Sequence, residues 1–294
     1  FRTSYTLNGF ARRSISLAFE GGPNEIALAN GDRVRINRYG SGVTFRRPLG
    51  NNWNASLGTL HQRVITTDSD GERVSQDVGP DQIPGTADDN PLTASGNPED
   101  DLWTVQFGVV QDLRNDPFAP TSGSVLRLGT EQSIPLGAGS IFFNRLRASH
   151  SYYIPVSFLN FSEGPQAIAI NVQGGTILGD FPPYEAFTIG GTNSVRGYDE
   201  GEVGTGQSYL QASIEYRFPL FSFLGGALFI DAGSDLGTGS AVTGSPGPDR
   251  GKPGSGFGYG AGVRVQTPLG PIRVDYGFSD EGEGRLHFGI GERF

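Results

Sequence analysis

The sequence predicts an all-β protein, a transmembrane antiparallel β-barrel. Three observations lead to this prediction. Many segments of strand length alternate apolar with polar residues, the connections between them are longer at one end of the sheet than at the other, and few segments have the period of a helix. Glycine and phenylalanine are abundant, with 46 and 20 residues among 294. We treat residues 1–294 as one transmembrane β-barrel domain.

About twelve segments have the length of strands that cross a bilayer at a tilt. In chain order they are residues 2–17, 40–48, 52–66, 102–113, 122–135, 139–155, 166–178, 207–219, 225–235, 256–267, 271–279 and 285–294. The last segment alternates up to a terminal phenylalanine, Phe294.

The connections between these segments fall into two groups. One end of the barrel carries every long loop, in connections 18–39, 67–101, 136–138, 179–206, 236–255 and 280–284. The other end carries shorter turns, at 49–51, 114–121, 156–165, 220–224 and 268–270. Outer-membrane barrels have short periplasmic turns and long outer loops. This pattern therefore places Phe294 on the periplasmic side.

The two faces of the predicted strands differ in polarity. In strand 207–219, apolar residues from Leu210 to Phe218 alternate with Gln211, Ser213, Glu215 and Arg217. The segment 271–279 likewise places Arg273, Asp275 and Gly277 on one face. We assign the apolar faces to lipid, because an Arg or Lys there would cost ~2–4 kcal/mol at the bilayer centre. A water-soluble β-sandwich is the alternative.

Composition narrows the functional classes. The formal charge of −9 argues against a nucleic-acid partner, which requires clustered Lys and Arg. The only histidines are His61, His150 and His287, and the chain lacks a G-x-S-x-G motif, so we expect no enzyme activity. We also expect no cofactor and no metal site.

The segment 68–101 is rich in aspartate. Its acidic residues include Asp68, Asp70, Asp77, Asp81, Asp88, Asp89, Asp100 and Asp101. Calcium binding is one interpretation, because Ca²⁺ prefers oxygen ligands. We favour a solvated acidic loop on the outer side.

Glycines gather on the inward face of the last strands. They are Gly256, Gly258, Gly260, Gly262, Gly277, Gly289 and Gly291. Glycine weakens a strand, so such a patch indicates close approach of another backbone. Relief of wall curvature is the alternative. We expect the loop 179–206 to be the element that docks there.

That loop contains the candidate functional motif. Its residues are Gly190, Gly191, Val195, Arg196, Gly197 and Tyr198. An arginine removed from bulk water needs acidic partners to offset its desolvation. The following strands offer Glu215 and Asp231 on their inward faces, so we predict that Arg196 pairs with both.

The run Val195–Tyr198 after a glycine pair resembles the loop motif of the BamA-type outer-membrane protein assembly superfamily. This superfamily includes two-partner-secretion transporters and the chloroplast import channel. Three further segments are similar to the same family, namely FIDAG at 229–233, TPLGPIRVDYGF at 267–278 and the terminal strand. The stretch DLRNDPFAPTSG at 112–123 is similar to its periplasmic turn before a barrel strand.

The resemblance implies a location and a larger barrel. It implies an outer membrane, of a Gram-negative bacterium, a cyanobacterium or a plastid envelope. Family barrels have about sixteen strands, so this chain would supply the C-terminal part, with earlier strands and periplasmic domains preceding it. Arg196 would lie in the lumen, and the terminal strand would carry the assembly signal. The residues of that strand and signal are Phe288, Gly289, Ile290, Gly291 and Phe294, and Glu292 stands where an apolar residue is usual.

The resemblance also implies a function, the insertion of client β-barrel proteins into the outer membrane. Client strands would pair with an exposed sheet edge at a weak seam, which Gly289 and Gly291 would loosen. A polypeptide-translocating pore for secretion or import is the main alternative, and a passive porin is a lesser one. The expected partners are membrane lipid, unfolded client polypeptides and accessory assembly proteins.

Overall fold

The chain forms a twelve-stranded antiparallel sheet in which the wall strands follow one another in chain order. The computed structural model describes residues 2–158, 162–221, 223–267 and 270–294. The wall strands are β1 (Ser4–Ile15), β2 (Arg35–Gly50), β3 (Trp53–Thr67), β4 (Glu99–Asp112), β5 (Gly123–Ile134), β6 (Phe142–Val156), β7 (Gln166–Asp180), β10 (Ser208–Phe221), β11 (Leu224–Ser234), β12 (Ser255–Val265), β13 (Ile272–Ser279) and β14 (Gly284–Ile290). The all-β prediction is confirmed.

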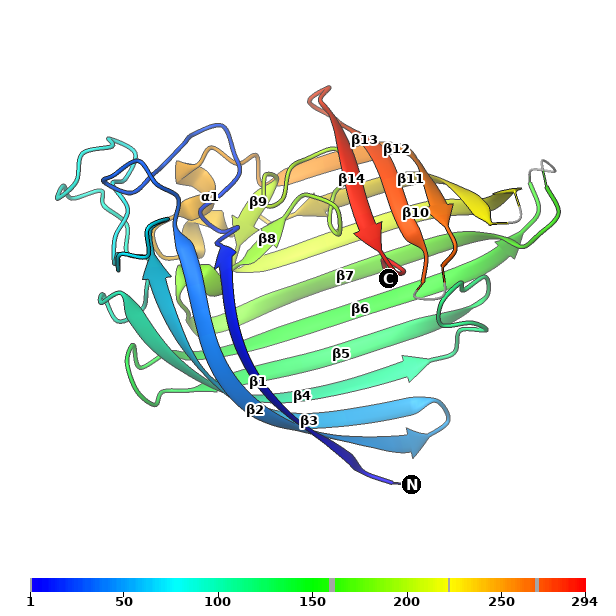
Figure 1. Cartoon of the computed structure of the whole chain (residues 1–294), viewed down its shortest axis with the longest axis horizontal. Coiled ribbons are helices and arrows are strands. Elements are labelled where there is room, and N and C mark those ends of the chain that lie inside the picture. The colour runs from blue at the N-terminus through cyan, green and yellow to red at the C-terminus, as the bar shows by residue number, and fades with distance from the viewer. Residues whose placement is uncertain (1, 159–161, 222, 268–269) are drawn as a thin grey trace.

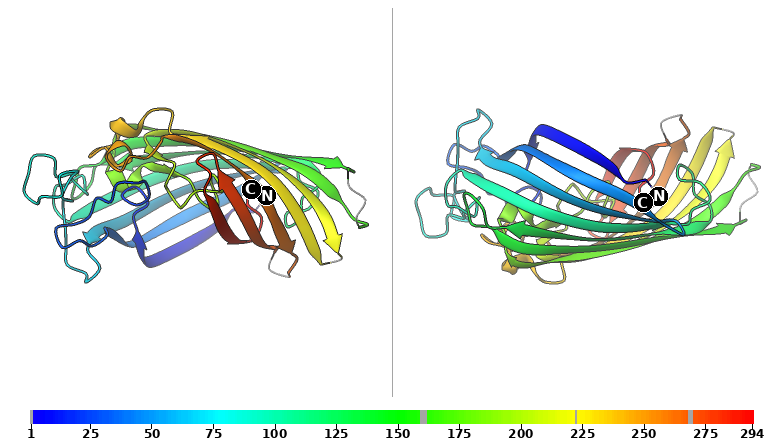
Figure 2. Two further views of the ribbon diagram at one scale, coloured as in Figure 1. Left: turned by 90° about the horizontal axis from the view of Figure 1, so that it is seen from above. Right: turned by 90° about the horizontal axis from the view of Figure 1, so that it is seen from below.

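The sheet curls into the wall of a barrel, with β1 and β14 as its end strands (Figure 1 and Figure 2). We call the space on its concave side the lumen. The predicted division into long and short connections is also confirmed. The turn between β2 and β3 has Asn51 and Asn52 at φ values of 49° and 62°, the backbone of a tight hairpin turn. Of the predicted turn 268–270, only Gly270 lies within the described residues.

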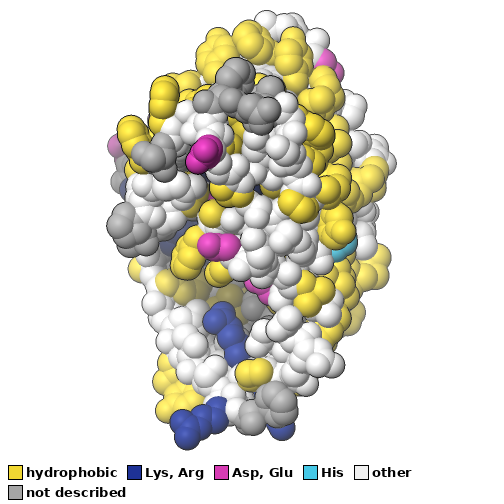
Figure 3. Space-filling model, turned by 90° about the vertical axis from the view of Figure 1, so that its right-hand side faces the viewer, with side chains coloured by type: hydrophobic (Ala, Val, Ile, Leu, Met, Phe, Trp, Pro, Cys, Tyr) yellow, Lys and Arg dark blue, Asp and Glu magenta, His cyan; other side chains and the backbone are white. Residues whose placement is uncertain are grey.

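Apolar side chains of the wall strands face outward, as predicted. The side chains of Ile214 and Leu228 point away from the lumen and are 50% and 49% exposed. Those of Ser213 and Glu215 are buried on the inward face. A view from the short-turn end shows hydrophobic side chains along the outer margins and basic side chains within the hollow (Figure 3). This inverted polarity is what a bilayer requires of a barrel wall.

Helical segments are single turns. They are η1 (Pro183–Glu185), η2 (Gly239–Ala241) and α1 (Pro246–Asp249). Within the described part of the chain, we find no helix with the length and hydropathy needed to cross a membrane.

Loops 16–34, 68–98 and 235–254 interlock at the long-loop end, and we call them the outer cap (Figure 1). Arg250 donates from Nε to the Gly21 carbonyl at 3.0 Å and from Nη1 to the Ile26 carbonyl at 2.9 Å. Lys252 Nζ donates to the Leu17 carbonyl at 3.1 Å, and burial lowers the pKa of Lys252 to about 7. An apolar cluster lies beneath them, formed by Ala18, Phe19, Leu28, Val34, Ile36, Val64, Leu92 and Tyr184.

The acidic segment 68–101 is more ordered than a solvated loop. Asp68, Asp77 and Asp100 are buried, and each accepts hydrogen bonds from two backbone amides. The favoured interpretation is therefore wrong for these three residues, because their carboxylates organise turns. Among the described residues, no group of three or more His, Cys, Asp or Glu is arranged to hold a metal ion.

Most strand boundaries lie within about three residues of the predicted ones, and two differ by more. Strand β2 begins at Arg35 rather than at residue 40, because residues 35–39 pair with β3. Strand β14 ends at Ile290, and Gly291 has a φ of 83°. The predicted strand 285–294 is therefore wrong beyond Ile290, and residues 292–294 turn into the lumen, where charged partners meet them.

Candidate functional site

The connection between β7 and β10, residues 181–207, enters the lumen, and we call it the lumenal loop. It contains a short hairpin in which β8 (Phe187–Ile189) pairs with β9 (Gly204–Gly206). This hairpin lies inside the curve of the sheet (Figure 1). Its strands were not predicted, because each has only three residues and no period can be read at that length.

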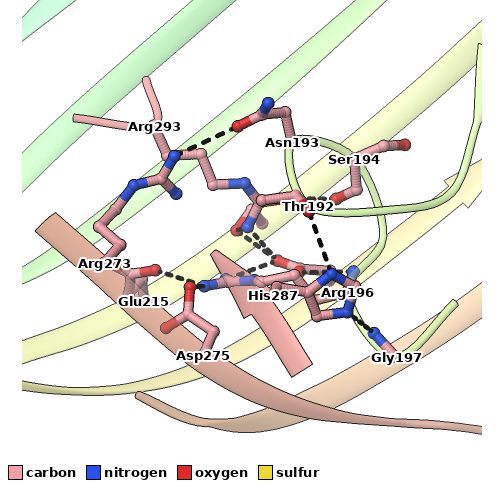
Figure 4. Close-up of polar contacts among 12 residues, drawn as sticks. Thr192, Asn193, Ser194, Arg196, Gly197, Glu215, Arg273, Asp275, His287 and Arg293 are labelled. Atoms are coloured by element: carbon pink, nitrogen blue, oxygen red, sulfur yellow. Dashed lines mark hydrogen bonds and ion pairs between the residues drawn. The ribbon is translucent and has the colours of Figure 1, made fainter. Parts of the chain in front are cut away.

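Arg196 lies at the centre of the site and is fully buried. Its Nε donates to Asp231 Oδ2 at 2.8 Å and its Nη2 to Asp231 Oδ1 at 3.1 Å, a bidentate pair. Its Nη1 donates to Glu215 Oε2 at 3.0 Å. Both predicted contacts are present, and Figure 4 labels Arg196 and Glu215.

Two partners of Arg196 were not predicted. Nη1 also donates to Asp275 Oδ2 at 3.0 Å. The guanidinium carbon lies 3.4 Å from the ring centroid of Phe229, a cation–π contact. Asp275 was detectable, because strand alternation had placed it on the inward face. The ring of Phe229 gave no such signal.

Further charges extend the cluster around Arg196. Arg264 donates to Asp275 at 2.5 Å and to Glu215 at 3.1 Å, and Arg217 donates to Glu215 at 2.8 Å. With Arg293 and Glu292, four arginines that include Arg196 face four carboxylates. These eight ion-paired groups therefore balance in formal charge, and the buried Arg273 lies beside them and donates to Asn193 Oδ1 at 3.2 Å.

Three inward glycines make room for the lumenal loop, as predicted. A Cβ on Gly258 would overlap the carbonyl oxygen of Arg196, and one on Gly277 would lie 2.7 Å from the Gly197 nitrogen. A Cβ on Gly256 would lie 3.0 Å from the Tyr198 ring. The close approach of backbone to backbone thus explains glycine at positions 258 and 277, and the packed Tyr198 side chain explains it at position 256.

The other glycines of the patch have different neighbours. Gly260 lies against the Phe229 ring, Gly262 against the Asp275 carboxylate and Gly289 against the Arg273 guanidinium. Gly291 follows β14 instead of lying in it. The docking prediction is therefore wrong for these four glycines.

The rest of the motif fixes the shape of the lumenal loop. Gly190, Gly191 and Gly197 have φ values of 116°, 98° and 103°, which side chains disfavour. Val195 and Tyr198 are buried with Ile189 and Val203 in a small apolar cluster. The Tyr198 hydroxyl donates to Asp280.

His287 connects the end strand β14 to this loop. Its Nε2 accepts a hydrogen bond from the Gly197 amide at 2.8 Å, and its Nδ1 lies 3.2 Å from Thr192 Oγ1 (Figure 4). Sequence reasoning assigned no partner to this histidine. Its place on the inward face, alternating with Leu286 and Phe288, was the available signal.

Residues 292–294 lie in the same cluster. Glu292 pairs with Arg217 at 2.7 Å, and Arg293 pairs with Asp231 at 2.8 Å, so Arg293 and Arg196 share one carboxylate. The Tyr153 hydroxyl donates to the Phe294 carbonyl. Of the predicted signal residues, Phe288 and Ile290 face outward on β14, whereas Phe294 lies inside.

Known proteins are similar to this chain in sequence and in fold. The Omp85 superfamily domain matches residues 1–294. The chain is 36% identical over 304 residues to outer envelope protein 80, chloroplastic, of Arabidopsis thaliana, covering 100% of the chain and 38% of that protein. It is 28% identical over 298 residues to TOC75, chloroplastic, of Pisum sativum, covering 97% of the chain and 35% of that protein. The chain thus spans little more than a third of these relatives.

Solved structures show the same fold at low sequence identity. BamA from Haemophilus ducreyi, lacking POTRA domains 1–3, aligns with a TM-score of 0.69 at 18% identity, over 99% of this chain and 59% of that chain. CdiB from Acinetobacter baumannii aligns with a TM-score of 0.59 at 17% identity, over 98% and 47%. The family match over the whole length confirms the resemblance found in the sequence, and this outer-membrane β-barrel chain belongs to the Omp85 superfamily.

Proposed function

We propose that this chain is the membrane part of an assembly factor that inserts client β-barrel polypeptides into an outer membrane. One observation carries the proposal, the character of the end strand β14. It has seven residues, against sixteen in β2, and among the described residues it pairs only with β13. Its Leu286, Phe288 and Ile290 are 70%, 62% and 68% exposed.

A short end strand of this kind can accept a client strand by β-augmentation. The amides and carbonyls on the edge of β14 away from β13 can supply backbone hydrogen bonds, and its apolar face would continue onto the client. Burial of the client's apolar side chains in lipid drives insertion. The proposed process uses no catalytic residue and no cofactor.

Relatives support this assignment and its location. BamA gives the structural likeness, and outer envelope protein 80 gives the higher sequence identity. The corresponding partners of this chain would be membrane lipid, unfolded client polypeptides and accessory assembly proteins. We propose a plastid envelope or a bacterial outer membrane as the location, with the short turns on the periplasmic or equivalent side.

A polypeptide-translocating channel is the second candidate. It is favoured by the similarity to TOC75 and by the polar inward face of the sheet. Translocation would require the lumenal loop and the outer cap to move, because both lie on the path through the lumen. Insertion at β14 leaves Arg196 in place.

Single cysteines can distinguish the two candidates, because the natural chain has none. We would place one on β14 as Ile290→Cys and, as a matched control, one on β11 as Ile230→Cys. Both positions face outward, but β11 has a partner on each side. A third variant, Ser56→Cys, places the thiol beside a lumenal cavity of about 240 Å³. The probe is a urea-unfolded eight-stranded barrel protein with a cysteine in its last strand, added to proteoliposomes.

The proposal predicts client disulfides at residue 290 and only background at residues 230 and 56. Preferential cross-linking at residue 56 would instead support translocation. Equal yields at residues 290 and 230 would contradict insertion at β14.

A further inference from the structure

The lumenal loop has a second attachment, eleven residues before Arg196 in the chain and on another part of the wall. Glu185 Oε1 accepts from Arg38 Nη1 of β2 at 2.6 Å, and Glu185 Oε2 accepts from Arg145 Nη2 of β6 at 2.5 Å. The Glu185 side chain is 8% exposed and that of Arg145 is 5% exposed. This carboxylate thus ties the loop to two strands that are not neighbours.

Residues next to Glu185 broaden the attachment. The Tyr184 hydroxyl donates to Asp100 Oδ2 of β4 at 2.7 Å, and the Tyr184 ring lies 5.2 Å from the guanidinium carbon of Arg38. The Glu185 carbonyl accepts a further bond from Arg145 at 2.7 Å. Contacts therefore reach β2, β4 and β6.

The charges around Glu185 require a carboxylate at this position. Arg145 also pairs with Glu131 of β5 at 2.8 Å, so two arginines face two carboxylates. Only one of these carboxylates, Glu185, belongs to the lumenal loop. Its removal would leave two buried guanidinium groups with a single carboxylate, a costly arrangement away from water.

The segment between the two attachments is packed against itself. Strand β8 pairs with β9, and Ile189, Val195, Tyr198 and Val203 form a buried cluster within the loop. A flexible connecting segment would allow the two parts of the wall to move independently. A packed segment fixed at both ends transmits force between them.

We propose that Glu185 is a positioning residue that makes the lumenal loop a strut between β2–β6 and β10–β13. The strut sets the separation of these two parts of the wall, and with it the position of the end strand β14 relative to β2–β6. Its importance for client entry rests on the proposed function. The strut itself does not, because it is a property of the folded barrel.

Distance measurements between two spin labels test the strut. Labels on cysteines at Tyr39 of β2 and Tyr259 of β12 report the separation, since both side chains face outward and are 51% and 48% exposed. We would compare Glu185→Gln with Glu131→Gln in the full chain, in lipid nanodiscs. Glu131 contacts the same Arg145 but lies in the wall, so its variant controls for the loss of one carboxylate.

Glu185→Gln should shift or broaden the distribution of distances between the labels, whereas Glu131→Gln should leave the parent distribution. Glu185→Asp keeps the charge but is too short to reach both arginines, and it should give an intermediate distribution. It serves as the measurable variant if Glu185→Gln does not fold. Parent-like distributions in the Glu185 variants, or an equal shift in Glu131→Gln, would overturn the strut.

The same variants separate the strut from the proposed function. Client cross-linking at residue 290 should change wherever the label distance changes. A changed distance with unchanged cross-linking would leave the strut intact and contradict its role in client entry. Absence of cross-linking in the parent chain would count against the proposed function alone, because the label distances do not depend on a client.

Discussion

Arg196 is held through four side-chain hydrogen bonds to three carboxylates. Its planar guanidinium can bond Asp231 with two nitrogens while a third reaches Glu215 and Asp275. A lysine ammonium offers three donors from a single atom and cannot reproduce this arrangement. The position therefore requires arginine, and not merely a positive charge.

Charge reversal tests this contact at the residue scale. Arg196→Glu should destabilise the barrel by about 3–5 kcal/mol, because it leaves buried carboxylates without their cation. Adding Asp231→Arg should recover part of the lost stability and part of the proposed client-insertion activity. Urea unfolding in detergent measures the change, and Arg12→Glu at an exposed position serves as the control. Absence of any recovery in the double variant would contradict a direct pair.

Glu185 should give the barrel an acid-sensitive contribution to stability. Burial alone would raise the pKa of this carboxyl, but Arg38 and Arg145 outweigh burial and lower the pKa to about 2 from the ordinary 4.5. A lowered pKa in the folded state contributes stability that is present above pH 4.5 and is lost as the pH falls toward 2. Between about pH 5 and about pH 3, a range that spans the ordinary carboxyl pKa, the urea midpoint of Glu185→Gln should therefore fall less than that of the parent. If the urea midpoints of the parent and of Glu185→Gln changed with pH in parallel, the lowered pKa of Glu185 would be refuted.

At the element scale, β12 shows why a strand interior contains several glycines. Gly256 and Gly258 face the lumenal loop, where an added Cβ would lie 3.0 Å from the Tyr198 ring and would overlap the Arg196 carbonyl oxygen, respectively. Glycine normally weakens a strand by roughly 0.5–1 kcal/mol relative to alanine. The contact with residues 196–198 offsets this loss, so strand and loop depend on each other.

Gly258→Ala should separate the loop from the strand. The added Cβ overlaps the Arg196 carbonyl, so we expect a destabilisation of about 1–3 kcal/mol, as for other overpacked sites. Gly129→Ala on β5 is the matched control, because the nearest atom to its Cβ would be the Phe107 carbonyl oxygen at 3.8 Å. That control should be neutral or slightly stabilising. Thermal unfolding followed by gel mobility compares the two, and equal midpoints would contradict the close approach.

On the scale of the whole molecule, the barrel is inverted relative to a soluble protein. Its buried ionic cluster lies inside, and its apolar side chains face outward. The outer cap closes over one end through contacts among three loops. The molecule therefore combines a lipid-facing wall with a polar interior that its own loop occupies.

Paired arginine substitutions test the inversion. Ile214→Arg places a charge on the outward face of β10 and should cost ~2–4 kcal/mol near the bilayer centre. Ser56→Arg places the same charge beside a lumenal cavity and should cost much less. Refolding yield into lipid vesicles measures both. Similar yields for the two variants would contradict the assignment of faces.

The sequence by itself determined the number of wall strands, their inward and outward faces and the end of the barrel that carries the long loops. These features are local, because alternation of polarity depends on neighbouring residues and the period of a strand is two. The same local register placed Glu215 and Asp231 inside, and the glycine-rich motif identified the loop that meets them.

Only the tertiary structure decided which distant residues meet inside the barrel. Glu185 contacts Arg38 from 147 residues away and Arg145 from 40 residues away, and curvature of the whole sheet brings these strands to the loop. The same holds for residues 292–294, which leave the wall after Ile290. Buried charges on β10 and β11 attract Glu292 and Arg293, and no pattern along the chain specifies how near those charges lie.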